Sequence, residues 1–490
     1  MRARLCLLTG LFFGSVLAHA ADDPANAAMK LYEKRRYEQA ARLIEDARSD
    51  GERSAQANLV LGMIYLRNAD LHEAFARTAA AAELDYLDKL TKAGGEGRSH
   101  YARLYLAEAL LVRGNAREAA QHFERVRADP GVEPRYRAIA AIGLGSALWA
   151  QHKPERATEL WAAAGDATEI KLARAAAQAR AQSVDAHSSQ RAAEDASHGK
   201  PLSARARRYL IEIHLAGGTP DAALAVARAG DLGAASYVEQ FKAAKGTAKA
   251  IAFYDLALLT DLAQLYRELA RRRLEQAADD PRMKPTAEYY LAEALSALGK
   301  NDEAAAMAQA FLARPQAPAQ YRERARARLA LVTYRQGKKE EAERAWTGVA
   351  EASTEPEVLV AVVLGCADAH AQCAKALARA AQVADAGDAR RYQPLSFALG
   401  TYYLRKQDYA RAISHMEAGR DKSNKNKIEA NDPEMLAGLA EAYFRTKKFS
   451  EGLEIFFEMS QEFAVVRQIQ EALQGVYSIE QRSAGDVRIL

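Results

Sequence analysis

The residues that decide the fold are LGMIYLRNADLHEAFARTAAAAELDY, at positions 61–86. On a helix, Gly62 and Ala74 are small enough to let two backbones approach, and Tyr65 fills the space beside them. The polar run at 68–70 predicts a short turn, and its aspartate is a residue type that caps a following helix. The stretch therefore predicts two antiparallel helices in close contact.

The same alternation of small and bulky residues returns along the chain. Equivalent first-helix positions, small in all but Ile211, fall at 28, 62, 107, 145, 211, 292, 330, 400 and 440. The gaps 145–211, 211–292 and 330–400 are close to twice a single unit, so each predicts one degenerate pair, for about twelve helix pairs in all. The residues expected to pack the pairs together are Gly62, Tyr65, Ala74, Gly114, Ala119, Gly145, Ala304, Ala342, Gly400, Tyr403 and Ala412.

These stretches resemble the tetratricopeptide repeat (TPR), whose signature is Leu-Gly, then Tyr, then Ala, then Phe. In residues 61–86, Thr78 stands at the Phe position, and Asn58 stands at the leading Trp position. The resemblance implies an all-α fold, a right-handed superhelical solenoid of about twelve TPR-like helix hairpins. It also implies that the first helix of each pair lines a concave groove, where ligands of this family usually lie.

The N-terminus is typical of a secretory signal peptide. Arg2 and Arg4 precede the apolar run Leu5–Leu17, and the small-x-small sequence Ala18-His19-Ala20 predicts cleavage after its last residue. The apolar run is shorter than the roughly 20 residues that a membrane-spanning helix needs, and no later stretch reaches that length. We therefore expect an exported, periplasmic chain with no membrane span after cleavage.

The rest of the chain is divided by one break in the pattern. The expected organisation is a signal peptide at 1–20, N-terminal TPR-like repeats at 21–180, a polar loop or hinge at 181–203, central repeats at 204–350, C-terminal repeats at 351–475 and a tail at 476–490. The hinge is predicted because AQSVDAHSSQRAAEDASHGKPLS has few large apolar residues and contains Gly199-Lys200-Pro201.

Composition narrows the class of protein. The sequence is 49% hydrophobic and only 8% aromatic, with many alanines, which suits closely packed helices. Its net charge is +4, and removing Arg2 and Arg4 with the leader leaves 4 − 2 = +2. That near balance argues against bulk nucleic-acid binding.

Two cysteines, Cys366 and Cys373, remain after the leader is removed. On one continuous helix they would lie about 10 Å apart, too far to bond. If residues 367–372 form a turn between two helices, the two side chains can face each other and form a disulfide. The alternative is a pair of buried thiols that act as small hydrophobic side chains.

Catalytic signatures are absent from the sequence. It contains no Gly-x-x-x-x-Gly-Lys-Ser/Thr phosphate loop and no Gly-x-Ser-x-Gly nucleophile elbow. His72-Glu73 begins like a zinc-protease motif, but position 76 is alanine. His187 and His198 share the polar loop with acidic residues, and we favour a solvated hinge there over a metal site. We therefore expect a protein that is not an enzyme and that has no catalytic residues, no cofactor and no metal site.

Four repeats place an apolar or aromatic residue and then an arginine near the end of the first helix. These pairs are Leu66-Arg67, Tyr334-Arg335, Leu404-Arg405 and Phe444-Arg445. In the family register they point into the groove, so we expect Arg67, Trp149, Tyr334, Arg335, Leu404, Arg405, Phe444 and Arg445 to contact a partner. The alternative is that each arginine merely ends its helix near the negative end of the dipole, and that Trp149 packs between neighbours. The arginine clusters at 205–208, 271–273 and 322–328 are interpreted as solvated outer faces, with contact to a partner or an anionic glycan as the alternative.

The function that the sequence favours is a periplasmic protein–protein interaction scaffold. Resemblance to exported repeat scaffolds suggests a role in cell-envelope assembly or exopolysaccharide secretion, an analogy at the level of fold. The expected partners are other envelope proteins, with anionic polysaccharide as a further option and nucleic acid excluded. The alternative is a carbohydrate-binding or cell-wall-processing accessory factor with the same α-superhelical fold.

Overall fold

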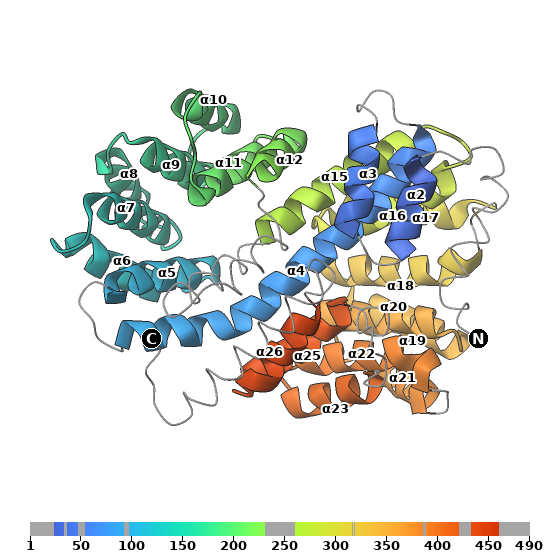
Figure 1. The fold of residues 1–490 in the computed structure, drawn as a ribbon. Helices are drawn as coiled ribbons and strands as arrows, with labels where there is room; N and C mark the ends of the chain where they lie inside the picture. Colours follow the sequence, from blue (N-terminus) through green and yellow to red (C-terminus); the bar gives the residue numbers. More distant parts are fainter. Residues whose placement is uncertain are drawn as a thin grey trace. The chain divides into compact units, whose positions relative to one another are not determined.

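The computed structural model describes residues 24–33, 37–47, 54–92, 98–230, 260–315, 317, 319–385, 389–420 and 433–459. Every helix or strand within these ranges is an α-helix (Figure 1). The predicted all-α class is therefore confirmed. The signal peptide expected at 1–20 and the tail expected at 476–490 lie outside the described residues, and the handedness of the solenoid stays a prediction. In the described ranges, no helix is both long enough and apolar enough to cross a membrane.

The chain forms two compact units. Unit 1 consists of Met1–Ala74 and Tyr266–Val466, and unit 2 consists of Phe75–Leu265 and Arg467–Leu490. Most of unit 2 is thus inserted into unit 1. The boundaries at 74–75 and 265–266 fall within helices rather than at the hinge expected at 181–203, and the third boundary lies outside the described residues. No sequence pattern indicates this insertion, because its two boundaries lie in stretches with a continuous helical pattern.

Unit 2 is built from helix hairpins stacked in chain order. Its complete helices are α5 (Arg98–Val112), α6 (Ala116–Ala128), α7 (Pro134–Trp149), α8 (Pro154–Ala163), α9 (Thr168–Arg180), α10 (Ala186–Ser197), α11 (Ala204–Ala216) and α12 (Pro220–Ala229). Each odd-numbered helix packs against the even-numbered helix after it, and α5, α7, α9 and α11 also contact one another in sequence. The first helices therefore form one continuous wall of the unit.

Unit 1 repeats this arrangement. Its complete helices are α2 (Pro24–Glu33), α3 (Tyr37–Ala47), α16 (Lys284–Ala297), α17 (Asn301–Ala313), α18 (Ala319–Arg335), α19 (Lys339–Ala352), α20 (Pro356–Asp368), α21 (Ala374–Asp385), α22 (Ala389–Arg405), α23 (Tyr409–Gly419), α25 (Pro433–Arg445) and α26 (Phe449–Met459). The first helices α16, α18, α20, α22 and α25 again contact one another in sequence. Two of the three predicted degenerate pairs are present, as α9–α10 and α20–α21, while most of the third lies outside the described residues.

The turns of seven of these hairpins share one backbone feature. A residue with positive φ precedes a small residue of the second helix by five positions, as Gly114 (φ 79°) precedes the buried Ala119. The positive-φ residues at this place are Gly114, His152, Gly218, Gly299, Gly337, Gln407 and Lys447. Glycine adopts this left-handed conformation without steric cost, which explains why it is the commonest residue there.

Close contact inside a hairpin depends on a small residue facing a large one. A Cβ atom at Gly145 would lie 2.5 Å from Nε1 of Trp161, and one at Gly400 would lie 2.4 Å from Cγ of Met416. Ala157 and Ala412, four residues before these large side chains, are fully buried. Ala304 and Ala342 are buried at the equivalent place in their hairpins, and Tyr403 stacks on His415 with ring centroids 5.2 Å apart.

The stretch at 61–86 does not form the predicted hairpin. It lies within a single helix, α4 (Ala55–Lys92), which runs through the expected turn at 68–70 (Figure 1). Gly62 instead faces α15 (Thr260–Ala278), where its Cβ would lie 2.7 Å from Cγ of Leu274 and 3.4 Å from the carbonyl oxygen of Ala270. This is the Gly145–Trp161–Ala157 arrangement again, so α15 is the second helix for the first part of α4. Ala74 is buried, but it does not pack on Gly62 as predicted.

The loop expected at 181–203 also contains a helix. α10 begins after Asp185, whose carboxylate accepts a hydrogen bond from the backbone N–H of Ser188 at 2.9 Å. Its buried residues are as small as Ala193 and Ala196. The sequence pattern does not indicate this helix, because α10 packs on α9 through alanine instead of large apolar side chains.

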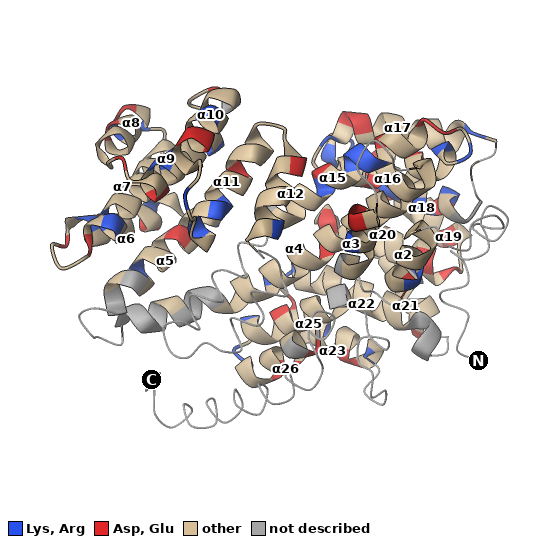
Figure 2. Cartoon of the chain, turned by 45° about the horizontal axis from the view of Figure 1, so that its top comes forward, with Lys and Arg blue, Asp and Glu red and all other residues tan. Residues whose placement is uncertain are grey.

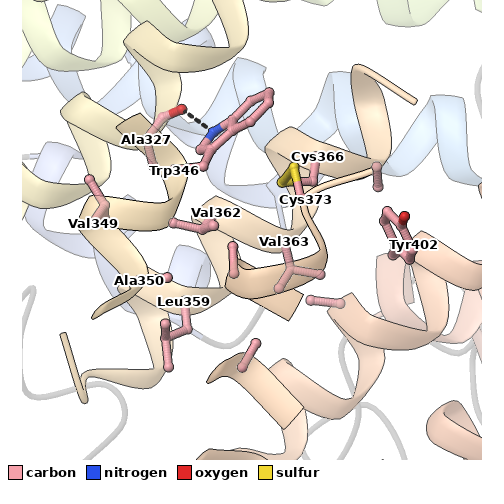
Figure 3. Close-up of a cluster of buried hydrophobic side chains, with 14 of the residues drawn as sticks. Ala327, Trp346, Val349, Ala350, Leu359, Val362, Val363, Cys366, Cys373 and Tyr402 are labelled. Atoms are coloured by element: carbon pink, nitrogen blue, oxygen red, sulfur yellow. Dashed lines mark hydrogen bonds between the residues drawn. A yellow bond between two sulfur atoms is a disulfide. The ribbon is translucent and has the colours of Figure 1, made fainter. Parts of the chain in front are cut away.

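The core of α18–α22 contains the cysteine pair (Figure 3). Trp346 is fully buried, and its indole N–H donates a hydrogen bond to the carbonyl oxygen of Ala327 at 2.9 Å. Cys366 ends the apolar face of α20, Cys373 precedes α21, and their sulfur atoms form a disulfide with the Cα atoms 6.2 Å apart. Of the two alternatives for these residues, the structure has the disulfide.

Candidate functional site

A cavity of about 70 Å³ opens on the first helices of four consecutive hairpins in unit 2. Its walls come from α5, α7, α9 and α11, with one ring of α6 behind them. We call it the α5–α11 cavity. Small-molecule sites usually have volumes of about 300–1,000 Å³. The α5–α11 cavity therefore has room for one side chain of a ligand and little more.

The floor of the cavity is apolar. It is made by Leu111, Phe123, Ile139, Ile142 and Ala173. Gly143 makes this floor possible, because a Cβ atom there would lie 2.4 Å from the ring of Phe123. Val112 also lines the cavity and is 61% exposed, so a ligand can reach its side chain.

The rim of the cavity is charged. Nη1 of Arg205 lies 2.5 Å from Oε1 of Glu108, and each side chain is only 14% exposed. The guanidinium of Arg205 also lies 4.8 Å from the ring centroid of Tyr105. Breaking such a buried ion pair would leave an uncompensated charge, so the pair holds this side of the rim in place. The other carboxylate oxygen of Glu108 accepts no hydrogen bond from the described residues.

The opposite side of the rim is more open. Nε of Arg180 lies 3.4 Å from Oε2 of Glu212, and the Arg180 side chain is 50% exposed. Burial raises the pKa of Tyr209 to about 12, against the opposing effect of the Arg205 guanidinium, so the phenol stays neutral at physiological pH. Arg208 completes the rim. Charges of both signs therefore surround an apolar floor, and Figure 2 shows the same mixture along the helices of this unit.

None of the predicted groove residues lines the α5–α11 cavity. Arg335, Arg405 and Arg445 are the last residues of α18, α22 and α25. Arg335 donates a hydrogen bond to the carbonyl oxygen of Ser296 at 2.9 Å, and Arg445 lies 3.5 Å from Glu441. The interpretation that arginine ends the first helix fits these three positions.

The apolar members of the same set are largely in the core. Leu404 is 6% exposed and Phe444 is 1% exposed, so neither offers a surface to a partner, contrary to our expectation. Tyr334 is partly buried, with its ring 5.9 Å from that of Trp346. Trp149 stacks on Trp161 at 5.6 Å, which fits the alternative that it packs between neighbours.

Arg67, the fourth predicted arginine, lies inside α4 rather than at a helix end. Its guanidinium is 3.4 Å from Asp70 and 6.0 Å from the ring centroid of Tyr37. Its contact with a partner, like those of Arg335, Arg405 and Arg445, stays a prediction.

The cavity residues themselves were not predicted. Arg205 and Arg208 were placed on a solvated outer face, whereas the structure places both at the rim. A signal was present, because Arg205, Arg208, Tyr209 and Glu212 follow the i, i+3, i+4, i+7 spacing of one helix face. The described residues contain no group of three His, Cys, Asp or Glu side chains placed to hold a metal ion.

Comparison with known proteins identifies the repeat. The tetratricopeptide repeat family matches residues 26–86 and 397–463. No curated protein matches the chain. Among solved structures, it is similar to the APC/C hetero-tetramer Cut9-Hcn1, at 13% identity with 91% of this chain and 94% of that chain covered and a TM-score of 0.26. It is also similar to yeast Tom70, at 12% identity with 95% and 97% covered and a TM-score of 0.31.

Two segments of the chain, residues 26–86 and 397–463, match tetratricopeptide repeats, and the described helices between them form hairpins of the same kind. Such repeats bind other proteins and are typically non-catalytic, which points to a protein–protein interaction scaffold.

Proposed function

We propose that the chain is an exported, non-enzymatic scaffold that binds an extended segment of a partner protein in the α5–α11 cavity. The observation that carries the proposal is that four consecutive first helices meet at one apolar floor with a charged rim. An extended segment can lie across several repeats while one of its apolar side chains enters the cavity. The charged rim then contacts the polar groups beside that side chain.

The proposed location is the bacterial periplasm. The sequence of residues 1–20 supports export, and the Cys366–Cys373 disulfide suits an oxidising compartment. We propose a role in cell-envelope assembly or exopolysaccharide secretion, in which the chain holds partner proteins together. Expression of the full chain in a bacterium, followed by fractionation and N-terminal mass analysis, tests this location. A periplasmic chain that begins at Ala21 would support it, and a cytoplasmic chain that retains Met1 would contradict it.

Binding is tested with a defined probe. A random-peptide display library is selected on the purified chain, and the best peptide is labelled with fluorescein for anisotropy titration. Val112→Lys and Arg180→Glu alter the mouth and the rim of the cavity, and each should weaken binding by about tenfold or more, or at least 1.4 kcal/mol. Val184→Lys and Arg127→Glu are matched controls, because Val184 is 42% exposed, the Arg127 side chain is 40% exposed, and neither lines the cavity.

The outcomes separate the two functions. If the control variants lose as much affinity as the cavity variants, the peptide binds elsewhere and the assignment is wrong. If the library gives no binder and an anionic polysaccharide binds the wild-type chain, the carbohydrate-binding alternative replaces the protein scaffold.

A further inference from the structure

The first helix of one repeat has two candidate second helices in the same chain. In the structure, Gly62 of α4 is covered by Leu274 and Ala270 of α15, all within unit 1. The residues directly after Gly62 have the same pattern, because Ala74 follows it by the twelve positions that separate Gly145 from Ala157 and Gly400 from Ala412. The family match also runs through residue 86 without interruption. A local hairpin is therefore encoded at the place where the structure has one continuous helix, which we call the straight form.

The turn position is one reason why α4 stays straight. In seven other hairpins, the residue five places before the small residue of the second helix has positive φ, and in four of them it is glycine. The equivalent residue in α4 is Ala69, which favours the right-handed helix and has a Cβ that opposes the left-handed conformation. A turn at this place is therefore strained, while continuation of the helix is not.

The side chain that fills the space beside Gly62 is the other reason why α4 stays straight. The two hairpins in which Gly145 and Gly400 occupy the first-helix position fill the space with Trp161 and Met416. A local hairpin at Gly62 would bring Thr78 there, which is smaller and carries a hydroxyl group. Leu274 fills the same space with an all-apolar side chain and is fully buried. The distant helix therefore covers Gly62 better than the local one.

Charged side chains also hold the straight form. Arg267 of α15 forms an ion pair with Glu73 of α4, and Asp70 lies 3.4 Å from Arg67 on the same helix. A turn at 68–70 would move Glu73 away from Arg267 and make Asp70 the cap of a new helix.

We propose that α4 is a two-state element, a straight helix covered by α15 or a closed hairpin covered by its own residues 71–86, and that Ala69, Thr78 and Leu274 set the balance. Closure at 68–70 would complete a continuous run of local repeats from residue 24 to residue 86. It would also release the face of α15 that now packs on Gly62. The straight form is the ground state, and substitutions at these three residues shift the population. This proposal does not depend on the proposed function.

Spin labels at Gln56 and Ala81 distinguish the two forms. Both side chains are partly exposed, and the native cysteines of the mature chain are held in their disulfide. In the straight helix the labelled positions are 81 − 56 = 25 residues apart, or about 38 Å at 1.5 Å per residue. In a closed hairpin they lie on adjacent helices, whose axes are about 10 Å apart. Pulsed dipolar spectroscopy reports the long distance, and continuous-wave line broadening reports the short one.

The wild-type chain should give the long distance alone. The double variant Ala69→Gly/Thr78→Leu should raise the short-distance population by about tenfold or more, which corresponds to about 1.4 kcal/mol. Leu274→Ala should shift the population in the same direction by weakening the competing helix. Ala80→Gly is the matched control, because it places glycine in α4 away from the turn, and it should retain the long distance.

Three results would overturn the proposal. One is a short distance in the wild-type chain, which would make the closed hairpin the ground state. Another is an unchanged long distance in a double variant that keeps its helical circular dichroism. If the double variant does not fold, the result for Leu274→Ala decides, and an unchanged long distance there contradicts the proposal.

Discussion

Replacing Gly145 by alanine tests the close contact that holds a hairpin together. The added Cβ would lie 2.5 Å from Nε1 of Trp161, 2.8 Å from its Cδ1 and 3.1 Å from the carbonyl oxygen of Ala157. The indole must therefore move, although its N–H donates a hydrogen bond to the carbonyl oxygen of Ile142 at 3.1 Å. The carbonyl oxygen of Ala157 belongs to the backbone of α8, so it can move away only if the helix moves with it.

The magnitude follows from three contributions. Overpacking a core costs about 1–3 kcal/mol, and leaving the buried indole N–H without its acceptor costs about 1–3 kcal/mol. Replacing glycine by alanine within a helix stabilises the helix by about 1 kcal/mol. We therefore expect Gly145→Ala to lower the free energy of local opening of α7 and α8 by about 1–5 kcal/mol.

Gly348→Ala is the matched control. Gly348 lies in α19, is exposed, and has no atom within 4 Å of the place where a Cβ would stand. This substitution should raise the local opening free energy of α19 by up to about 1 kcal/mol through helix propensity alone. Native-state hydrogen exchange measured by mass spectrometry reports both helices in the full chain. If Gly145→Ala slows exchange in α7 and α8 or leaves it unchanged, the contact does not have the energy assigned to it.

Three further predictions follow from the structure. The Cys366–Cys373 disulfide spans a sequence separation of 7, so its reduction should lower the opening free energy of α20 and α21 by about 2.4 kcal/mol. Hydrogen exchange in the double variant Cys366→Ala/Cys373→Ala should not respond to reductant. Faster exchange in that variant on adding reductant would contradict this prediction. Burial lowers the pKa of His72 from 6.5 to about 4. As the pH falls, the unfolded chain therefore binds a proton at this residue before the folded chain does, and the free energy of unfolding should fall by about 3 kcal/mol between pH 6.5 and 4. Urea unfolding should show a smaller loss in His72→Gln. Burial raises the pKa of Asp70 from 3.8 to about 6, so Asp70 acts with the opposite sign, and Asp70→Asn should steepen the loss of stability between pH 6 and 4 in the same assay; a shallower loss would contradict the assignment.

The sequence was sufficient for the repeats because their packing is local. Gly145, Ala157 and Trp161 lie within 16 residues of one another, so their spacing predicts the contact that the structure has. The same spacing at Gly62 and Ala74 predicted a hairpin that does not form. The deciding side chain there is Leu274, more than 200 residues away, and no local pattern indicates which of two competing helices will cover a glycine.

The candidate site was harder to predict than the fold. Its rim combines Glu108 of α5 with Arg205 of α11, and this pairing depends on how the degenerate pair α9–α10 stacks between them. Because the sequence of that pair is typical of a loop in part, it does not indicate which face of α11 carries Arg205, and the arginine was assigned to an outer face. The predicted arginine stripe relied on the family register alone, and Arg335 shows the limit of this inference because it hydrogen-bonds the neighbouring first helix.

Hydrogen exchange of the chain with and without the selected peptide tests most directly whether the first helices of unit 2 form the binding surface. Bound peptide should slow exchange in α5, α7, α9 and α11, and it should leave the outer helices α6, α8 and α10 within error of the free chain. Protection confined to α6, α8 and α10, or spread over unit 1 alone, would show that the partner binds another face.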